Sequence, residues 1–351
     1  MRSMNNATKM MCAAALAACA TAWAEPVKII LDTDMYSDYD DVGALACLHA
    51  LADAGEAEIL AVGSCTWGAT NRSVAACEII NAYYGRADIP VGTCRHGGRE
   101  GAGDRGYGLP EKFPQWVKHL DGQTAPDAWK IYRQALAAAP DGSVVMCSLG
   151  FMNNLADLLK SAGDEISPLA GRDLVAKKCR LWVCMACNYP DGKEYNSKWD
   201  PPASDYAFRN WPTPVVFTDF QYGRYCFAGR AVAELPGEGN PVKEAFKRRL
   251  LKREKVVPFG DVKRRKATWD QDAGHPSWDE TAILIAVRGW EPYFDLERGM
   301  FEMVGTDGDD VWKPDPKSAN GRVVEKMHRQ DVARILDELM CRPPKCRAVS
   351  K

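Results

Sequence analysis

The sequence predicts an α/β fold, in which helices cover both faces of an open, mostly parallel β-sheet. Short apolar runs alternate with longer segments of helical periodicity along most of the chain, an order that is typical of parallel sheets. Several of the apolar runs lack polar alternation, as strands buried on both faces do. No internal repeat or linker interrupts residues 25–351, so we expect a single Rossmann-like domain there.

The expected strands and helices follow one another along the chain. Short apolar runs predict strands at 27–31, 58–64, within 85–92, 143–147, 181–186 and within 211–217, with small strands at 301–304, 311–312 and 322–325. Apolar residues at helical spacing predict helices at 42–54, 71–84, 127–138 and 331–340, and others after 148, 200 and 279. Residues 95–124 are rich in glycine, proline and charge, so we expect a loop. The basic segment 242–266 is expected to be a solvated helix face.

The first 24 residues have the pattern of a secretion signal. A positive start and an apolar run at 10–20 precede Ala22-Trp23-Ala24, an A-x-A cleavage site. We therefore expect residues 1–24 to be a signal peptide and the mature protein to be exported, either periplasmic or secreted. The residues ending at Cys19 also resemble a lipoprotein box, in which Cys19 would carry a lipid anchor. A first helix of the fold would need a polar face, which this run lacks.

Composition argues against two classes of protein. The formal charge is -2, whereas nucleic-acid-binding proteins usually carry a basic excess, so we expect no nucleic-acid partner. Beyond the N-terminus, no apolar stretch reaches transmembrane length.

Four cysteines in apolar stretches are expected to be small core residues: Cys47, Cys77, Cys147 and Cys184. The sequence leaves the oligomeric state open, and a homo-oligomer is compatible with it.

Five aspartates follow the first strand closely: Asp32, Asp34, Asp38, Asp40 and Asp41. They lie between this strand and a helix, at the sheet edge where open α/β folds bind their ligands. Like charges at such short range raise one another's pKa, which makes a bare cluster unfavourable. A hard divalent cation with oxygen ligands, calcium or magnesium, would neutralise them. The alternative is a solvated acidic loop in which an aspartate caps the helix.

This stretch resembles the opening of the inosine–uridine preferring nucleoside hydrolase family, which has a strand, Asp-x-Asp and an Asp-Asp pair before a helix. Asp32-Thr33-Asp34 and Asp40-Asp41 match these elements, although the spacer between them is longer here and contains Asp38. Further matches follow in the family's order: a turn with Gly150 and Asn154, then Asn188 followed by Glu194-Tyr195-Asn196, then Asp279 before an apolar helix. The resemblance implies a nucleoside hydrolase-like domain over residues 25–351.

The resemblance also implies an activity and a set of site residues. The activity is that of an N-glycosidase, which splits a small-molecule nucleoside or another ribosyl compound into free base and ribose with calcium (Ca2+) as cofactor. The implied metal ligands are Asp34, Asp41, the Leu149 carbonyl and Asp279. Asp34 would also be the catalytic base that takes a proton from water. The residues implied to bind the ribose hydroxyls are Asp40, Asn188, Glu194 and Asn196, whose amide and carboxylate groups suit a vicinal diol.

The chain departs from the family next to Asp279. Trp278 replaces a family histidine that helps the base leave, and His275 lies close enough in the sequence to substitute for it. An indole cannot donate a proton as an imidazolium can, but it can stack on a base. Purines carry a basic N7 and uridine does not, so we expect a preference for purine nucleosides, with Trp278 binding the base. The alternative is that Trp278 only packs under the helix that carries Asp279.

Two other functions are compatible with parts of the sequence. A haloacid dehalogenase-type phosphatase also begins with a strand and Asp-x-Asp, and it binds magnesium. Against it, Tyr36 stands where threonine or valine is usual, and no downstream lysine precedes a paired acidic strand end. The second alternative is a non-catalytic protein that binds calcium or a sugar on the same fold, and Trp278 in place of the histidine is its main support.

Overall fold

A computed structural model describes residues 25–35, 39–67, 72–97, 107–251 and 274–345 of the chain. The expected signal peptide at 1–24, which includes Cys19, lies outside these residues, as do Asp38 and the second half of the basic segment. Among the described helices, none is long and apolar enough to cross a membrane.

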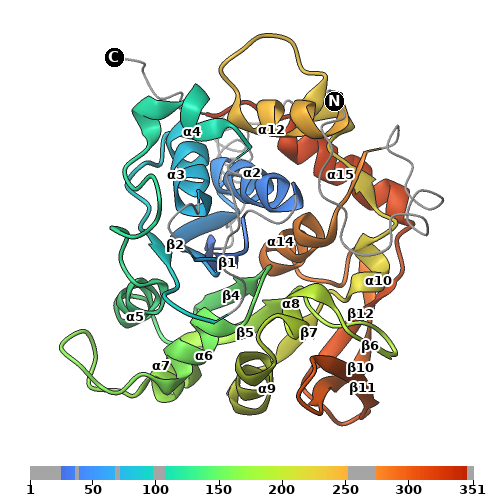
Figure 1. Ribbon diagram of the computed structural model, residues 1–351. Helices are drawn as coiled ribbons and strands as arrows, with labels where there is room; N and C mark the ends of the chain where they lie inside the picture. The colour runs from blue at the N-terminus through green and yellow to red at the C-terminus, as the bar shows by residue number, and fades with distance from the viewer. Residues whose placement is uncertain (1–24, 36–38, 68–71, 98–106, 252–273, 346–351) are drawn as a thin grey trace, which may run out of the picture.

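One sheet of ten strands runs through the centre of the molecule (Figure 1). Its strands lie in the order β3-β2-β1-β4-β5-β7-β12-β10-β11-β6. Neighbouring strands from β3 to β12 are parallel, whereas β10, β11 and β6 extend the sheet by antiparallel pairs. The strands are β1 (Val27–Thr33), β2 (Ala57–Ser64), β3 (Val91–Thr93), β4 (Val144–Ser148), β5 (Cys179–Cys184), β6 (Asp191–Gly192), β7 (Val215–Phe217), β10 (Phe294–Val304), β11 (Asp309–Pro314) and β12 (Gly321–Glu325). A separate antiparallel pair joins β8 (Phe227–Ala228) to β9 (His275–Pro276).

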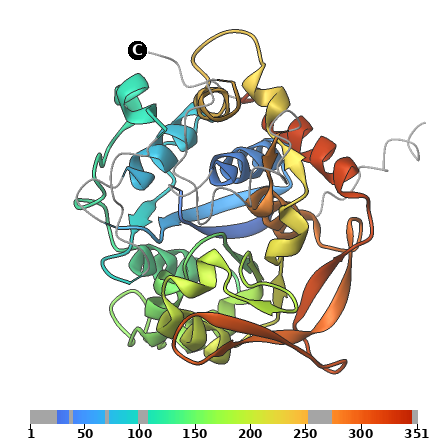
Figure 2. The ribbon, with the colours of Figure 1, turned by 45° about the vertical axis from the view of Figure 1, so that its right-hand side comes forward.

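Helices cover both faces of the sheet (Figure 2). On one face lie α2 (Asp40–Asp53), α3 (Ser73–Tyr83), α12 (Pro241–Leu250), α14 (Trp278–Arg288) and α15 (Arg329–Met340). On the other lie α5 (Ala128–Ala138), α6 (Asn153–Lys160), α7 (Gly171–Lys178) and α9 (Pro201–Asn210). The short helices are α4 (Leu109–Lys112), α8 (Tyr195–Lys198), α10 (Phe220–Gly223) and α11 (Arg230–Ala233).

The side chains of β1 alternate between the two cores. Ile29 and Leu31 belong to the core that α2 and α14 cover, and Ile30 belongs to the core that α5 and α6 cover. All three side chains are fully buried, and each such burial stabilises the fold by ~1.5–3 kcal/mol. The strand is therefore apolar on both faces, and its polar residues gather at its end, beginning with Asp32.

The predicted fold class is confirmed, because the sheet is mostly parallel and helices cover both of its faces. Several details differ from expectation, including these three. The segment 95–124 contains α4 and a 3-10 turn at Pro114–Trp116, α7 was not expected, and β10 begins at Phe294 instead of residue 301. In the first half of β10, Asp295, Glu297 and Arg298 are charged, so no apolar run marks the strand. The four cysteines expected in the core, including Cys184, are buried.

Candidate active site

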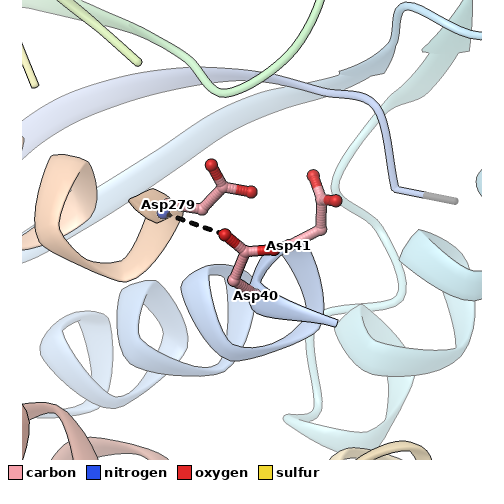
Figure 3. A group of neighbouring side chains, drawn as sticks. All are labelled: Asp40, Asp41 and Asp279. Atoms are coloured by element: carbon pink, nitrogen blue, oxygen red, sulfur yellow. Dashed lines mark hydrogen bonds between the residues drawn. The ribbon is translucent and has the colours of Figure 1, made fainter. Parts of the chain in front are cut away.

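Three aspartates meet where two helices begin (Figure 3). Asp40 and Asp41 open α2, and Asp279 lies in the first turn of α14. All three are buried, and one carboxylate oxygen from each lies within 4.8 Å of the others. The Asp279 backbone N–H also donates to Asp40 Oδ2 at 3.4 Å. Both helices direct the positive ends of their dipoles at these carboxylates, which partly offsets the repulsion between them.

This aspartate triad needs a positive partner to be fully ionised. Burial raises the pKa of Asp279 well above its ordinary value, and the nearby charges of Asp40, Asp41 and Asp34 raise it further. Carboxylates held this close are stable as anions only when a cation neutralises them. Oxygen ligands of this kind suit calcium or magnesium. The residues of the triad therefore fit a hard divalent cation.

Thr33 fixes the position of one member of the triad. Its hydroxyl, at the end of β1, donates to Asp41 Oδ1, and its Oγ1 accepts the Met35 backbone N–H at 3.1 Å. The side chain is completely buried. One hydroxyl thus orients the Asp41 carboxylate and fixes the turn that leaves β1.

Asp34 lies in that turn, beside the triad but not among the three oxygens that converge most closely. It is buried, and the loop after β4 packs directly against it. A Cβ atom at Gly150 would lie 2.7 Å from the Asp34 Cβ, so this approach requires a glycine. Asp34 is thereby held at the carboxyl end of β1, next to the residues that follow β4.

Leu149 and Asn196 are joined by a hydrogen bond. The Asn196 Nδ2 donates to the Leu149 carbonyl at 2.8 Å and to the Met185 carbonyl at 3.0 Å. The side-chain amide of Asn196 therefore bridges the ends of β4 and β5. A carbonyl oxygen has two lone pairs, so this bond still leaves the Leu149 carbonyl able to serve as a ligand, and it leaves Asn196 Oδ1 to contact a sugar.

Glu194 is the N-cap of α8. Its Oε2 accepts the backbone N–H groups of Asn196 at 2.7 Å, Ser197 at 3.1 Å and Cys187 at 3.3 Å. Burial raises the pKa of Glu194 to about 8, although these N–H groups lower it. The cap holds the side chain in one orientation, and none of these three bonds uses Oε1.

Asn188, one of the residues expected to bind ribose, is half-buried and held by its neighbours. Its Oδ1 accepts from Gln221 Nε2 at 2.7 Å, and its Nδ2 donates to the Asp191 carbonyl at 3.2 Å. A Cβ atom at Gly192 would lie 2.3 Å from Asn188 Nδ2. The side chain is thus packed tightly against the loop that follows it.

Asp32 lies behind the site. Its Oδ2 accepts from Tyr132 Oη at 2.5 Å and from Asn154 Nδ2 at 2.9 Å. Burial raises its pKa to about 7. Tyr132 belongs to α5 and Asn154 to α6, so Asp32 ties the end of β1 to the helices on one face of the sheet.

These observations agree with the comparison to known protein families. The sequence profile of the inosine–uridine preferring nucleoside hydrolases matches residues 29–337. The chain belongs to this family. Its members hydrolyse N-glycosyl bonds and depend on a metal, and the buried aspartate triad of this nucleoside hydrolase could bind such an ion. No curated protein sequence matches the chain.

Several solved structures share the fold at low sequence identity. The type III effector protein XopQ complexed with adenosine diphosphate ribose is 18% identical, with 90% of this chain and 92% of that chain covered and a TM-score of 0.66. The purine-preferring ribonucleoside hydrolase from Gardnerella vaginalis is 18% identical, with 89% and 96% covered and a TM-score of 0.63. The inosine–uridine preferring nucleoside hydrolase from Bacillus anthracis is 14% identical, with 90% and 99% covered and a TM-score of 0.61.

Trp278, which replaces a family histidine, and the nearby His275 are both buried. Trp278 stacks on Phe220 with ring centroids 5.3 Å apart, and its Nε1–H donates to the Phe220 carbonyl at 2.9 Å. His275 lies near the start of α2, because its ring is centred 6.1 Å from that of Tyr39 and 6.5 Å from that of Trp278. The Trp278 ring therefore has a packing partner on one face.

Two residues that contact the site were not singled out from the sequence. Thr33 lies between the two aspartates of the Asp-x-Asp motif, and this position could have indicated that its side chain lies at the site. Asp310 accepts a hydrogen bond from the Asn188 backbone, yet it lies 122 residues further along the chain in a short, charged strand. Only the folded chain brings Asp310 to the site.

Proposed function

We propose that this nucleoside hydrolase uses calcium to hydrolyse ribonucleosides, with a preference for purines, outside the cytoplasm. The observation that carries the proposal is the buried triad of Asp40, Asp41 and Asp279 at the edge of the sheet, in a chain that belongs to a metal-dependent hydrolase family. Calcium binds oxygen ligands at about 2.4 Å, so two ligands of one ion lie at most about 4.8 Å apart. The spacing of the triad meets this limit.

The ligands proposed for calcium are Asp34, Asp41, the Leu149 carbonyl and Asp279, and Asp40 lies in the same group. A bound divalent cation would neutralise the carboxylates and make a nearby water more acidic. Asp34 then acts as the general base, which accepts the proton of the water that attacks the anomeric carbon. Asp34 suits this role because Gly150 holds it at the strand end, beside the triad.

The ribose is proposed to lie against Asp40, Asn188, Glu194 and Asn196. Three of these belong to the segment 188–197, and their hydrogen bonds to the protein fix their orientation. Rigid donors and acceptors would hold the sugar while its anomeric carbon gains oxocarbenium character. The Glu194 Oε1 and the Asn196 Oδ1 are the atoms that the capping and bridging bonds leave for the sugar.

The purine preference rests on how the base leaves. The departing base needs a proton, and a purine has a basic N7 that can take one. Trp278 cannot supply that proton, and the buried His275 nearby is the candidate donor. The purine-preferring enzyme from Gardnerella vaginalis, which has the same fold, supports this preference. Whether Trp278 also stacks on the base is a separate prediction, because Phe220 already packs on one ring face.

Export is proposed from the signal-like residues 1–24 alone. Cleavage after Ala24 would release the mature chain, whereas lipidation of Cys19 would anchor it to a membrane. Mass spectrometry of the N-terminal peptide from the exporting cell distinguishes these two forms. An intact Met1 on the cytoplasmic protein would refute export.

A product screen tests the proposed activity against its two alternatives. The chain from residue 25 is supplied with calcium and incubated with inosine, uridine and an aryl phosphate, and free base, ribose and phosphate are measured. We expect base and ribose from inosine, less from uridine, and no phosphate. Phosphate release would indicate a phosphatase, and binding of inosine without products would indicate a non-catalytic protein. Asp279→Asn, which removes one triad charge, should abolish the release of ribose.

A further inference from the structure

We propose that Asp310 is a positioning residue, which holds the ribose-binding segment 188–197 in place from outside the parallel sheet. The inference rests on the proposed function, because this segment carries Asn188, Glu194 and Asn196. Asp310 belongs to β11, in the antiparallel part of the sheet. The β10–β11 hairpin would therefore be part of the active site.

One carboxylate joins the two ends of this segment. Asp310 Oδ1 accepts the Asn188 backbone N–H at 2.8 Å. Its Oδ2 accepts the Glu194 backbone N–H at 3.3 Å and the Ser197 hydroxyl at 3.0 Å. The side chain is 1% exposed, so water cannot easily replace these bonds. The distance between Asn188 and Glu194 along the sugar site thus depends on Asp310.

The backbone of β11 supports the same segment between these two ends. Residues 310 and 311 pair with β6, which lies in the middle of the segment. The Trp312 backbone N–H donates to the Pro190 carbonyl at 2.8 Å. Gly192, opposite Asp310 in this pairing, leaves room for the Asn188 side chain. Asp310 is therefore the charged centre of a continuous contact between the hairpin and the segment.

An asparagine in this position could not replace the aspartate. A carboxylate accepts at both oxygens, and hydrogen bonds to a charged acceptor are roughly twice as strong as neutral ones. In Asp310→Asn, the new amide nitrogen is a donor and would face either the Asn188 or the Glu194 backbone N–H. One end of the segment would be released, while the size of the side chain stays the same.

The neighbouring residue provides a matched control. Asp309 forms an ion pair with Lys193 at 3.2 Å, and both side chains are about half exposed. Exposed pairs of this kind contribute little. Asp309→Asn therefore makes the same chemical change on the same strand without releasing the segment.

The experiment compares Asp310→Asn, Asp309→Asn and the wild-type protein in calcium. For inosine we expect KM to rise by about 10–100-fold in Asp310→Asn, with kcat and the calcium affinity within about threefold of wild type, because the triad lies on other elements. Backbone hydrogen exchange in 188–197 should be at least about tenfold faster. Asp309→Asn should match the wild type in all of these measurements.

Two results would overturn the inference: unchanged KM and exchange in Asp310→Asn, or a loss of stability that lowers calcium affinity and kcat while KM stays constant. If Asp310→Asn does not fold, Ser197→Ala removes one of the three bonds and should raise the exchange rate at Glu194 by a smaller factor. An unchanged rate in Ser197→Ala would also count against it. If the wild type does not hydrolyse inosine, the proposed function fails, but hydrogen exchange still decides whether Asp310 holds the segment.

Discussion

Replacing Trp278 tests whether its ring packs against the protein or binds the base. The ring is 7% exposed, stacks on Phe220 and donates a hydrogen bond to the Phe220 carbonyl. Trp278→Ala removes all three contributions. Trp278→Phe keeps a smaller aromatic ring on Phe220 and loses the N–H. Together the two variants separate the ring from its hydrogen bond.

The structure predicts a large effect of Trp278→Ala on stability. Truncation of a buried tryptophan costs ~3–5 kcal/mol, a large part of the ~5–15 kcal/mol by which a typical domain is stable. In Trp278→Phe, the loss of one neutral hydrogen bond costs ~0.5–1.5 kcal/mol, and the smaller ring adds a packing loss that is less than that of Trp278→Ala. If the ring instead stacked on the base, its loss would weaken purine recognition by ~1–3 kcal/mol, which is about 5–150-fold in kcat/KM.

Urea unfolding and steady-state kinetics with inosine and uridine measure these two effects. A packing role predicts a large loss of unfolding free energy in Trp278→Ala, with kcat/KM reduced by the same factor for both substrates. That reasoning is refuted if the stability is unchanged and kcat/KM falls for inosine alone. Trp278 would then be a base-binding residue.

Three further predictions concern single groups. Asp34→Asn should lower kcat by ~10²–10⁴-fold while inosine still binds, and a loss below about tenfold would place the base elsewhere. Burial raises the pKa of Glu194 from 4.5 to about 8 and that of Asp310 from 3.8 to about 6. Both carboxyl groups therefore stay protonated to a higher pH in the folded chain than in the unfolded chain. The stability that this difference contributes is complete below the pKa values of the unfolded chain, and it is lost as the pH rises to about 8. In EDTA, the free energy of unfolding should therefore fall between about pH 5 and about pH 8.5, and less so in Glu194→Gln; a rise would contradict this sign. Thr33→Val should weaken calcium binding by about 10–100-fold, because Thr33 orients Asp41, and Thr33→Ser should restore it; equal calcium titrations for all three proteins would show that the hydroxyl is dispensable.

The parts of the fold that sequence predicts are those with local signals. Three of these signals are close together in the sequence: the apolar run of β1, the aspartates after it and the start of α2. Their order can be recognised without knowledge of the fold. The same holds for Asp279 at the start of α14. Both helix starts place acidic residues where the dipole favours them. The resemblance implied that Asp41 and Asp279 share a metal, whereas the third member of the triad is Asp40, which was expected to bind ribose.

Other parts of the site depend on contacts between distant segments. Asp310 lies in a short strand that begins with two aspartates, and nothing near it in the sequence points to the segment 188–197. The partner of the Trp278 indole is a backbone carbonyl, that of Phe220, which no side-chain pattern reveals. Asn196 looks like a solvent-facing sugar ligand, yet its amide nitrogen bridges two strand ends. Packing determines these roles, and packing is a property of the whole chain.

The central claim is that the buried aspartates hold a metal that the reaction requires. The most direct test is the rate of ribose release from inosine while calcium is titrated into metal-free protein. The account predicts no measurable release after chelation, saturable recovery as calcium is added, and no recovery in Asp41→Asn at the same concentrations. Ribose release at an undiminished rate from the chelated protein would contradict the claim.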